Sequence, residues 1–149
     1  MISIDTNVLV YVSDDDEPAK QATARDLIRA AMLRPTRLGL QVVGELQNVL
    51  LRRLKQPPWV AAQNARNVLH AFDTFAANER ASEEALTQMA AGRLSYWDAL
   101  LVFSARDAGV KTLLTEDMQD GAVVGGVTII NPFAPDGSLS ATAQAALKA

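Results

Sequence analysis

The sequence predicts an α/β fold in which helices flank a mostly parallel central sheet. Short apolar segments that suit buried strands alternate with longer segments whose apolar residues recur at helical spacing. Acidic residues also follow several of the apolar segments directly, where parallel strands would end. The 149 residues fit one domain, and a hydrophobic content of 49% is typical of a folded protein rather than a disordered one.

The predicted strands are short apolar runs bounded by turn or helix signals. The first covers residues 2–4, and the following stretch DTNVLVYV leads into a segment that suits either a helix or an extended chain. A second strand is expected at residues 38–40. Two further strands come late in the chain, in VKTLLTED (110–117), which ends in an acidic loop, and in VTIINPF (127–133), which Pro132 stops.

The predicted helices lie between these strands and are placed by their start and stop signals. Residues 14–17 are acidic and precede Pro18, which suits the N-terminus of a helix over residues 19–33. The expected buried face of this helix consists of Ala24, Leu27, Ile28, Ala31 and Met32. The other helices are expected at residues 41–55, ended by Pro57 and Pro58; at 59–77; at 82–91, capped by Ser82 and closed by Gly92; and at 95–109, capped by Ser95 and closed by Gly109. Residues 1–133 would form the domain, and residues 134–149 a tail that is either frayed or a loosely docked helix.

The composition excludes several classes of protein. The chain has no cysteine, which excludes disulfides and thiolate-bound metals. A net charge of −3 argues against a protein that coats nucleic acid through a basic surface, but it is compatible with an enzyme that holds nucleic acid through bound cations. The N-terminus lacks the basic start of a signal peptide, and no apolar stretch reaches the length of a membrane span. We therefore expect a soluble, cytoplasmic protein.

Two acidic residues occupy places where apolar side chains are expected. Asp5 directly follows the first predicted strand, inside an otherwise apolar stretch. Glu45 lies on or beside the apolar stripe of its helix, between Val42 and Val49. A carboxylate at a buried edge needs a partner, because burying an unpaired charge costs several kcal/mol. One interpretation of Glu45 is a rim residue paired with an arginine, and the other is a functional acid.

Asp98 and Asp117 extend this pattern. Asp98 shares a helix face with apolar residues, although Ser95 and Asp98 also have the spacing of a capping box. Asp117 follows the strand KTLLT, and an ordinary turn acid is the alternative interpretation. Glu116 and Asp120 compete with Asp117 for any role at this point, because all three lie beyond the strand.

Asp5, Glu45, Asp98 and Asp117 should converge on one edge of the sheet. Carboxylates that are crowded together repel one another unless cations lie among them. Hard cations such as Mg²⁺ and Mn²⁺ prefer oxygen ligands, and they can activate a water and offset the charge on a phosphodiester as it reacts. The sequence therefore predicts a carboxylate-held metal site for phosphodiester chemistry, with these four acids as its catalytic and metal-binding residues.

Four motifs, in order along the chain, resemble those of the PIN-domain family. The opening strand with Asp5, Thr6 and Asn7 is similar to the DTN signature of the family, and VVGELQNVLLRRL is similar to its second motif. LSYWDALLVFSARDAGVKTLLTEDM resembles the third and fourth motifs, and INPF resembles the ending of many members. The resemblance covers about residues 1–133, and the most similar subgroup is that of the VapC-type toxin ribonucleases from toxin–antitoxin pairs.

The resemblance implies a Rossmann-like PIN fold and an endoribonuclease that depends on Mg²⁺ or Mn²⁺. By position, Asp5, Asp98 and Asp117 would bind metal, whereas Glu45 would bind metal or help to position the attacking water. The residues that would hold these acids in place are Thr6, Asn7 and Thr115. The resemblance also implies an RNA substrate, a cognate antitoxin that blocks the site, and frequent homodimerisation.

A few other residues are candidates for contact with RNA. Tyr96 and Trp97 flank Asp98 and could stack on a base, but packing in the core is the simpler expectation. His70 is expected to be structural, because no second histidine and no nucleophile accompanies it. The basic residues that could hold an RNA backbone, each of which could equally be ordinary surface charge, are Arg34, Arg37, Arg52, Arg53 and Lys55.

Other classes of protein fit the sequence less well. A phosphatase with a nucleophilic aspartate normally has a second acid two residues later, where this chain has Asn7, and a receiver domain would need paired acids after the first strand and a lysine after a late strand. A dinucleotide-binding protein would need a glycine-rich turn after the first strand. The serious alternative is a catalytically silent PIN-like module that binds RNA or protein, which turnover would distinguish from a nuclease.

Overall fold

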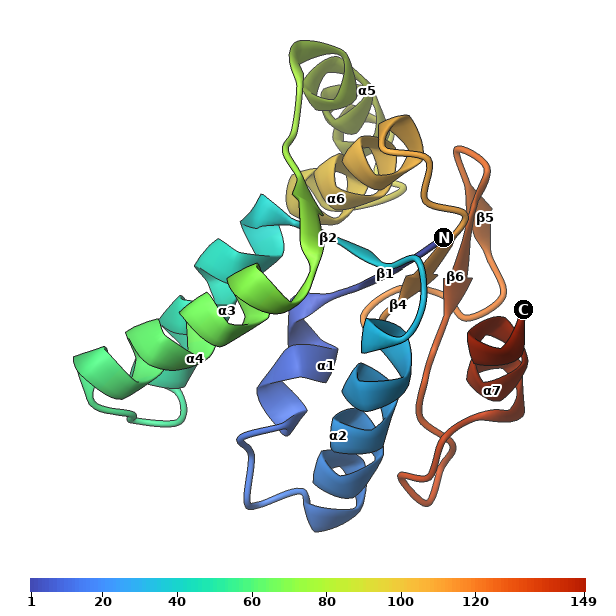
Figure 1. Cartoon of the computed structure of the whole chain (residues 1–149). Helices are drawn as coiled ribbons and strands as arrows, with labels where there is room; N and C mark the ends of the chain where they lie inside the picture. Colours follow the sequence, from blue (N-terminus) through green and yellow to red (C-terminus); the bar gives the residue numbers. More distant parts are fainter.

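Three parallel strands form the centre of the molecule in the computed structural model, which describes all 149 residues (Figure 1). The strands are β1 (Ile2–Ile4), β2 (Arg37–Gly39), β3 (Asp73–Phe75), β4 (Thr112–Leu114), β5 (Val123–Val124) and β6 (Val127–Ile130). The helices are α1 (Thr6–Tyr11), α2 (Pro18–Met32), α3 (Leu40–Arg52), α4 (Pro58–Ala71), α5 (Glu79–Ala90), α6 (Tyr96–Asp107) and α7 (Ala141–Lys148).

The sheet is mostly parallel, as the sequence predicts. Its strand order is β1-β4-β6-β5, in which β1, β4 and β6 are parallel and β5 is antiparallel to β6. A parallel pair of β2 and β3 lies beside β1, to which a bridge between Ile2 and Thr36 connects it. Ile4 at the end of β1 is in register with Leu114 at the end of β4. The residues that follow these two strands therefore emerge at the same edge of the sheet.

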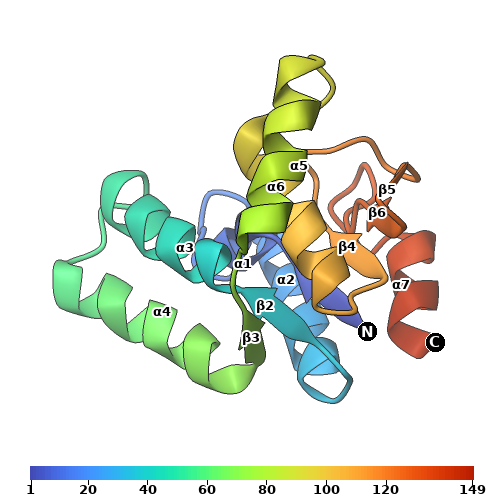
Figure 2. The ribbon, with the colours of Figure 1, turned by 90° about the horizontal axis from the view of Figure 1, so that it is seen from above.

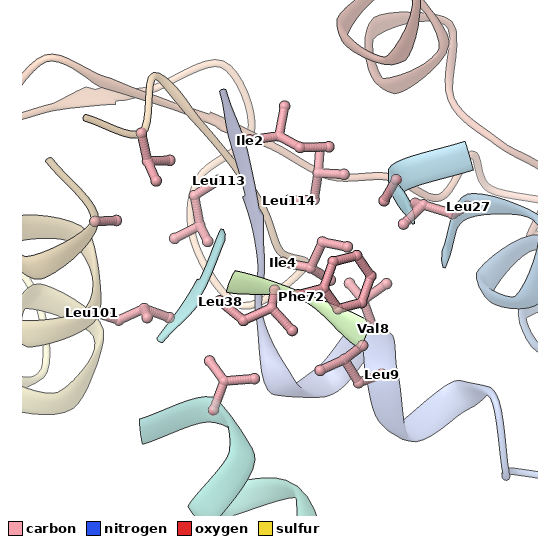
Figure 3. Close-up of a cluster of buried hydrophobic side chains, with 14 of the residues drawn as sticks. Ile2, Ile4, Val8, Leu9, Leu27, Leu38, Phe72, Leu101, Leu113 and Leu114 are labelled. Carbon is pink, nitrogen blue, oxygen red and sulfur yellow. The ribbon is translucent and has the colours of Figure 1, made fainter. Parts of the chain in front are cut away.

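The hydrophobic core surrounds the central strands. Ile4, Leu113 and Leu114 have no exposed surface, and they pack with Leu38 and Phe72 from the neighbouring segments (Figure 3). The first two helices add Val8, Leu9 and Leu27 to the same cluster. Burying a side chain of this size contributes about 1.5–3 kcal/mol, so the ends of β1 and β4 are among the firmly held parts of the chain.

The stretch DTNVLVYV is a turn into a helix, which decides between the two structures that the sequence allows. Asp5 has an extended backbone, with φ −82° and ψ 163°, and is the N-cap of α1. Its carboxylate accepts a hydrogen bond from the backbone N–H of Thr6 at 2.7 Å. The chain therefore passes from strand to helix at Asp5 itself, which fixes this side chain at the sheet edge.

Helices α3 and α4 pack against each other, and so do α5 and α6. Figures 1 and 2 show the two pairs extending from the sheet in different directions. Each pair brings one helix to the sheet edge, α3 in one pair and α6 in the other. Helix α3 begins directly after β2, and α6 follows α5 through a short turn. Ser95 caps α6 as expected, with its Oγ accepting a hydrogen bond from the N–H of Asp98 at 3.1 Å.

The expected helix over residues 59–77 is wrong in its second half. Helix α4 ends at Ala71, and residues 73–75 form β3, which pairs with β2. Pairing with a neighbouring strand satisfies the backbone groups of this short segment, and three residues are too few for an alternating pattern to reveal it. The two-residue strand β5 is also absent from the expectation.

Two smaller expectations about helices are also wrong. Helix α5 begins before Ser82, because Asn78 is its N-cap and accepts a hydrogen bond from the N–H of Ala81 at 2.8 Å. Met32, expected on the buried face of α2, is 55% exposed because the helix ends there and leaves the core. Ala24, Leu27 and Ala31 are buried as predicted.

Residues after Phe133 include helix α7, which packs on the rest of the molecule. Ser140 caps it by accepting a hydrogen bond from the N–H of Ala143 at 3.2 Å, and Ala143 and Leu147 are buried. The tail is therefore a docked helix rather than a frayed end. None of the helices combines the length and the apolar character that crossing a membrane requires.

Candidate active site

Asp5 is the most buried of the four predicted acids and lies at the carboxyl end of β1. Its backbone N–H donates to the carbonyl oxygen of Leu114 at 2.9 Å, which ties it to β4. One carboxylate oxygen accepts from the N–H of Thr6, and the other accepts from the hydroxyl of Thr115 at 2.8 Å. Only 5% of its surface is exposed. Hydrogen bonds from two segments therefore fix the position of this carboxylate.

Thr115 and Asn7 connect Asp5 to Asp117. The side-chain amide of Asn7 donates to Thr115 Oγ1 at 3.1 Å and to Asp117 Oδ2 at 2.8 Å, with a longer contact of 3.4 Å to Asp5 Oδ2. The N–H of Asp117 donates back to Thr115 Oγ1 at 3.2 Å. Asn7 and Thr115 thus hold two acids that come from opposite ends of the chain.

Glu45 reaches the same edge of the sheet from helix α3. Its Oε2 accepts from the hydroxyl of Thr6 at 2.8 Å, and its Oε1 accepts from the amide of Gln41 at 2.8 Å. The same amide of Gln41 donates to the carbonyl oxygen of Trp97 at 3.1 Å. Glu45 forms no ion pair with an arginine, so the interpretation of a rim residue paired with arginine is wrong.

Asp98 lies in the first turn of α6, where its backbone N–H completes the cap with Ser95. Its half-buried side chain lines a cavity that Asp117 also lines. The capping interpretation and the functional interpretation of Asp98 therefore hold together, because the backbone makes the cap while the carboxylate faces the cavity.

The four acids influence one another electrostatically. Burial raises the pKa of Asp5 from 3.8 to about 6, against the lowering effect of hydrogen bonds from Thr115 and Thr6, and the negative charges of Glu45 and Asp117 raise it further. Burial also raises the pKa of Asp98, with a lowering contribution from Ser95 and raising contributions from Asp117 and Glu45. None of the four acids has a lysine, arginine or histidine as an ion-pair partner. The edge of the sheet therefore carries concentrated, uncompensated negative charge.

A hard divalent cation fits this set of residues in its donor chemistry. All four side chains offer carboxylate oxygens, which Mg²⁺ and Mn²⁺ prefer, and a cation would offset the repulsion that adds to the effect of burial on the two pKa values. In this structure no three acidic or histidine side chains already stand close enough together to hold an ion. Three of the four carboxylates instead accept hydrogen bonds from the side chains of Thr6, Asn7 and Thr115, so the acids form an open cluster rather than a closed cage.

Glu116 and Asp120, the two acids that compete with Asp117, have partners of their own. Glu116 forms an ion pair with Lys20 at 2.9 Å and accepts a hydrogen bond from the hydroxyl of Tyr11. Asp120 accepts from the N–H of Asn131 at 2.8 Å. Asp117 is the acid of this loop whose carboxylate accepts from Asn7, and it lines both the cavity of Asp98 and the cavity of Glu45, the second of which Glu116 lines as well.

Of the five basic residues expected to hold RNA, the structure brings only Arg53 to the cluster. Arg53 lines a cavity of about 370 Å³ with Glu45, Asn7 and Asp117, and it lies 3.6 Å from Asp14. Arg37 instead donates to the carbonyl oxygens of Thr74 and Ala108, which makes it structural. The residues that line none of the cavities beside the acids are Arg34, Arg37, Arg52 and Lys55.

Of the two aromatic residues beside Asp98, Tyr96 packs against a buried cluster as expected, whereas Trp97 does not. Trp97 is 60% exposed and lines a cavity with Gln41 and Glu45, while its ring meets that of Tyr96 edge-on at 5.0 Å. His70 is exposed on α4 and lines none of these cavities.

Sequence reasoning missed three polar residues on the other side of the cluster. Gln88, Arg93 and Gln119 line the cavity of about 610 Å³ that Asp98 and Asp117 share. Nothing in the local sequence distinguishes them, because Gln88 lies within a helix and Arg93 follows the helix-closing Gly92, where a basic residue is common.

Comparison with known proteins agrees with the fold. Residues 2–119 match the sequence profile of the PIN domain. No curated protein sequence matches the chain. Among solved structures, VapC20 of Mycobacterium tuberculosis, described as a sarcin–ricin loop cleaving toxin, is 20% identical over 78% of this chain and 90% of its own, with a TM-score of 0.64.

Two complexes are also similar in fold. A toxin–antitoxin complex from Klebsiella pneumoniae contains a chain that is 19% identical, over 89% of this chain and 98% of that one, with a TM-score of 0.64. VapBC2 from Rickettsia felis, bound to a DNA fragment from its promoter, contains one that is 14% identical, over 87% of this chain and 97% of that one, with a TM-score of 0.60. At these identities the likeness shows a shared fold.

Proposed function

The chain belongs to the PIN domain family, and from this premise we propose that it is a Mg²⁺- or Mn²⁺-dependent endoribonuclease that acts as the toxin of a type II toxin–antitoxin pair. The observation that carries the proposal is the convergence of Asp5, Glu45, Asp98 and Asp117 without a basic partner. The four acids come from four separate segments of the chain, and the fold brings them to one edge of the sheet.

The chain's own residues would prepare this site before RNA arrives. Thr6 donates a hydrogen bond to Glu45 and Thr115 donates one to Asp5, which orients these two carboxylates. Asn7 donates a hydrogen bond to Asp117 and holds it beside them. Asp5, Glu45, Asp98 and Asp117 are the residues that would hold the metal, and Glu45 is also placed to orient a water. When bound, a divalent cation would supply activation of that water and neutralise charge on the phosphodiester.

Rigid support of the carboxylates matters for such chemistry. Their positions depend on the ends of β1 and β4, which are buried, and on hydrogen bonds between segments far apart in sequence. A metal site held in this way does not need to reorganise its scaffold for each substrate.

The toxin class and the partners of the protein are supported by the structural neighbours. These include a protein described as a sarcin–ricin loop cleaving toxin and two toxin–antitoxin complexes. We therefore include in the proposal an RNA substrate, a cognate antitoxin that covers the acidic site, and action in the cytoplasm. A homodimer is also proposed, and the exposed Leu86 and Met89, three residues apart on α5, are candidate contacts for it.

The experiment that tests the function is cleavage of structured RNA by the purified protein with Mg²⁺ or Mn²⁺. Asp5→Asn and a chelator serve as controls. Cleavage by the wild-type protein with metal, and in neither control, supports the proposal. Equal cleavage by the wild type and Asp5→Asn would contradict it, because the activity would then come from a contaminant. RNA or protein binding without any cleavage would favour a silent binding module.

A further inference from the structure

The cavity beside Asp98 and Asp117 is larger than those acids need for a metal ion. Its volume is about 610 Å³, within the range of about 300–1,000 Å³ that small-molecule sites occupy. Its lining residues come from the end of α5, from α6 and from the segment between β4 and the end of β6. Figure 1 shows where these elements lie in the fold. Because Asp98 and Asp117 form part of its wall, whatever occupies the cavity lies directly beside the candidate reaction centre.

The floor of the cavity is apolar and held in place. Phe103 is 5% exposed, and the backbone at Gly125 approaches its ring so closely that an added Cβ would lie 2.8 Å from it. The guanidinium of Arg106, fixed by Glu84 at 2.5 Å, also lies 5.0 Å from the centre of the ring. The floor therefore exists before any ligand binds, and it suits a flat apolar face such as that of a nucleobase.

Three polar side chains in the lining of the cavity, those of Gln88, Arg93 and Gln119, have no partner in the protein. The side chains of Gln88 and Gln119 make no hydrogen bond, although each amide offers both a donor and an acceptor. Arg93 is exposed, forms no ion pair, and is the single basic residue in the lining. Amides suit the edge of a base, and an unpaired guanidinium suits a phosphate.

We propose that this cavity binds one unstacked nucleotide of the RNA substrate, adjacent to the phosphodiester that faces Asp98 and Asp117. Arg93 contacts a phosphate of that nucleotide, and Gln88 and Gln119 contact the edge of its base. Single-stranded RNA is recognised in this way, by bases that leave the stack and present their edges to side chains. The inference rests on the proposed ribonuclease function and adds to it the residues that select the nucleotide.

The first arm of the test measures which nucleotides flank the cut. A randomised single-stranded RNA pool is incubated with Mg²⁺ or Mn²⁺, and the ends of the products are sequenced. We expect the wild type to prefer certain bases at one position beside the cut. Gln88→Ala or Gln119→Ala should weaken this preference by at least about fivefold, as expected for loss of a contact to a base edge. Gln63→Ala, at an exposed position on α4, is the matched control and should keep the preference.

The second arm measures RNA binding in chelator and therefore does not depend on cleavage. A fluorescent RNA of random sequence is titrated at several salt concentrations. Arg93→Ala should reduce the slope of log affinity against log salt by about 0.7, the value for one phosphate contact on single-stranded RNA. Arg66→Ala removes the same charge from an exposed and unpaired position on α4, and it should leave the slope unchanged.

The two arms separate failure of this inference from failure of the function. If the wild type cuts but all three variants behave like their controls in both arms, the nucleotide site is overturned and the ribonuclease stands. If the wild type does not cut, the ribonuclease is overturned, and the binding arm alone decides the site. Melting curves of the variants show whether each is folded, which we expect because the three positions are exposed or half-buried.

Discussion

The side-chain amide of Asn7 donates a hydrogen bond of 2.8 Å to Asp117, which is 110 positions away in the sequence. Asn7 lies in the first turn of α1, and Asp117 lies in the loop after β4. Together with Thr115, this contact links the first and the last acid of the candidate site. In the proposed metal site, a residue of this kind would touch a metal ligand rather than the metal and would determine how well that ligand is placed.

Replacing Asn7 with alanine should therefore reduce RNA cleavage with little loss of folding. We expect cleavage to fall by about 10- to 100-fold, the usual effect of removing a group that orients a metal ligand. Cleavage rates of the variant and of Asn67→Ala, an exposed asparagine on α4, provide the comparison. Equal rates for Asn7→Ala and the wild type would show that Asp117 needs no support from Asn7.

Glu45→Gln should affect activity far more than stability. Glutamine keeps the shape of the side chain and can still accept a hydrogen bond from Thr6, so the unfolding free energy should change by no more than about 1 kcal/mol. Loss of the negative charge should lower cleavage by about 100-fold or more if Glu45 binds metal or orients water. Glu83→Gln, at an exposed position on α5, is the control. A Glu45→Gln variant that cuts normally would remove Glu45 from the site.

The identity of the acid after β4 can be tested within one loop. Asp117→Asn should abolish cleavage, whereas Glu116→Gln should retain most of it, because Glu116 is already paired with Lys20. Glu116→Gln should instead lower the melting temperature slightly, since it weakens the contact between α2 and this loop. The reverse order of the two activities would assign the role to Glu116.

Removing divalent cations should lower the melting temperature. A cation that binds only the folded protein stabilises it by about 1.4 kcal/mol at about ten times its dissociation constant. The effect should be smaller in Asp5→Asn, which lacks one of the proposed ligands. Thermal denaturation with Mn²⁺, with Mg²⁺ and with chelator measures both changes. Melting curves that do not respond to either cation would contradict the metal site.

In chelator, stability should fall as the pH rises, because of Asp5. Its pKa is raised from 3.8 to about 6 in the folded protein, so the folded state holds its proton more tightly than the unfolded state does. The stabilisation is fully present below about pH 3.8 and is lost as the pH rises through 6. Relative to Asp5→Asn, the unfolding free energy of the wild type should fall by about 2 kcal/mol between pH 4 and pH 7. Parallel pH profiles for the two proteins would show that Asp5 is not the cause.

The sequence predicts the sheet well and draws attention to the acids, because both leave local signals. Ile2–Ile4 and Thr112–Leu114 are buried apolar runs, and Asp5 and Asp117 stand out by following them. Strand β3 leaves no such signal, since its three residues directly follow helix α4 and are defined by pairing with β2.

The surroundings of the acids are harder to predict than the acids themselves. The partners of Glu45 and Glu116 come from segments remote in the sequence, and so does the cavity around Arg93. The spacing of apolar residues predicts which face of a helix is buried, but it does not predict which residues pack against that face. For this reason Arg37 and Arg53, which look alike in the sequence, have different roles in the structure.

The position of β4 between β1 and β6 has a consequence for how the protein is made. Asp5, Glu45 and Asp98 are synthesised before β4, but Asp5 gains its contacts with Leu114 and Thr115 only when β4 pairs with β1. A nascent chain on the ribosome therefore carries most of the acids without an assembled site. If the protein cleaves RNA as proposed, it stays harmless to the translation machinery until its last third has emerged and folded.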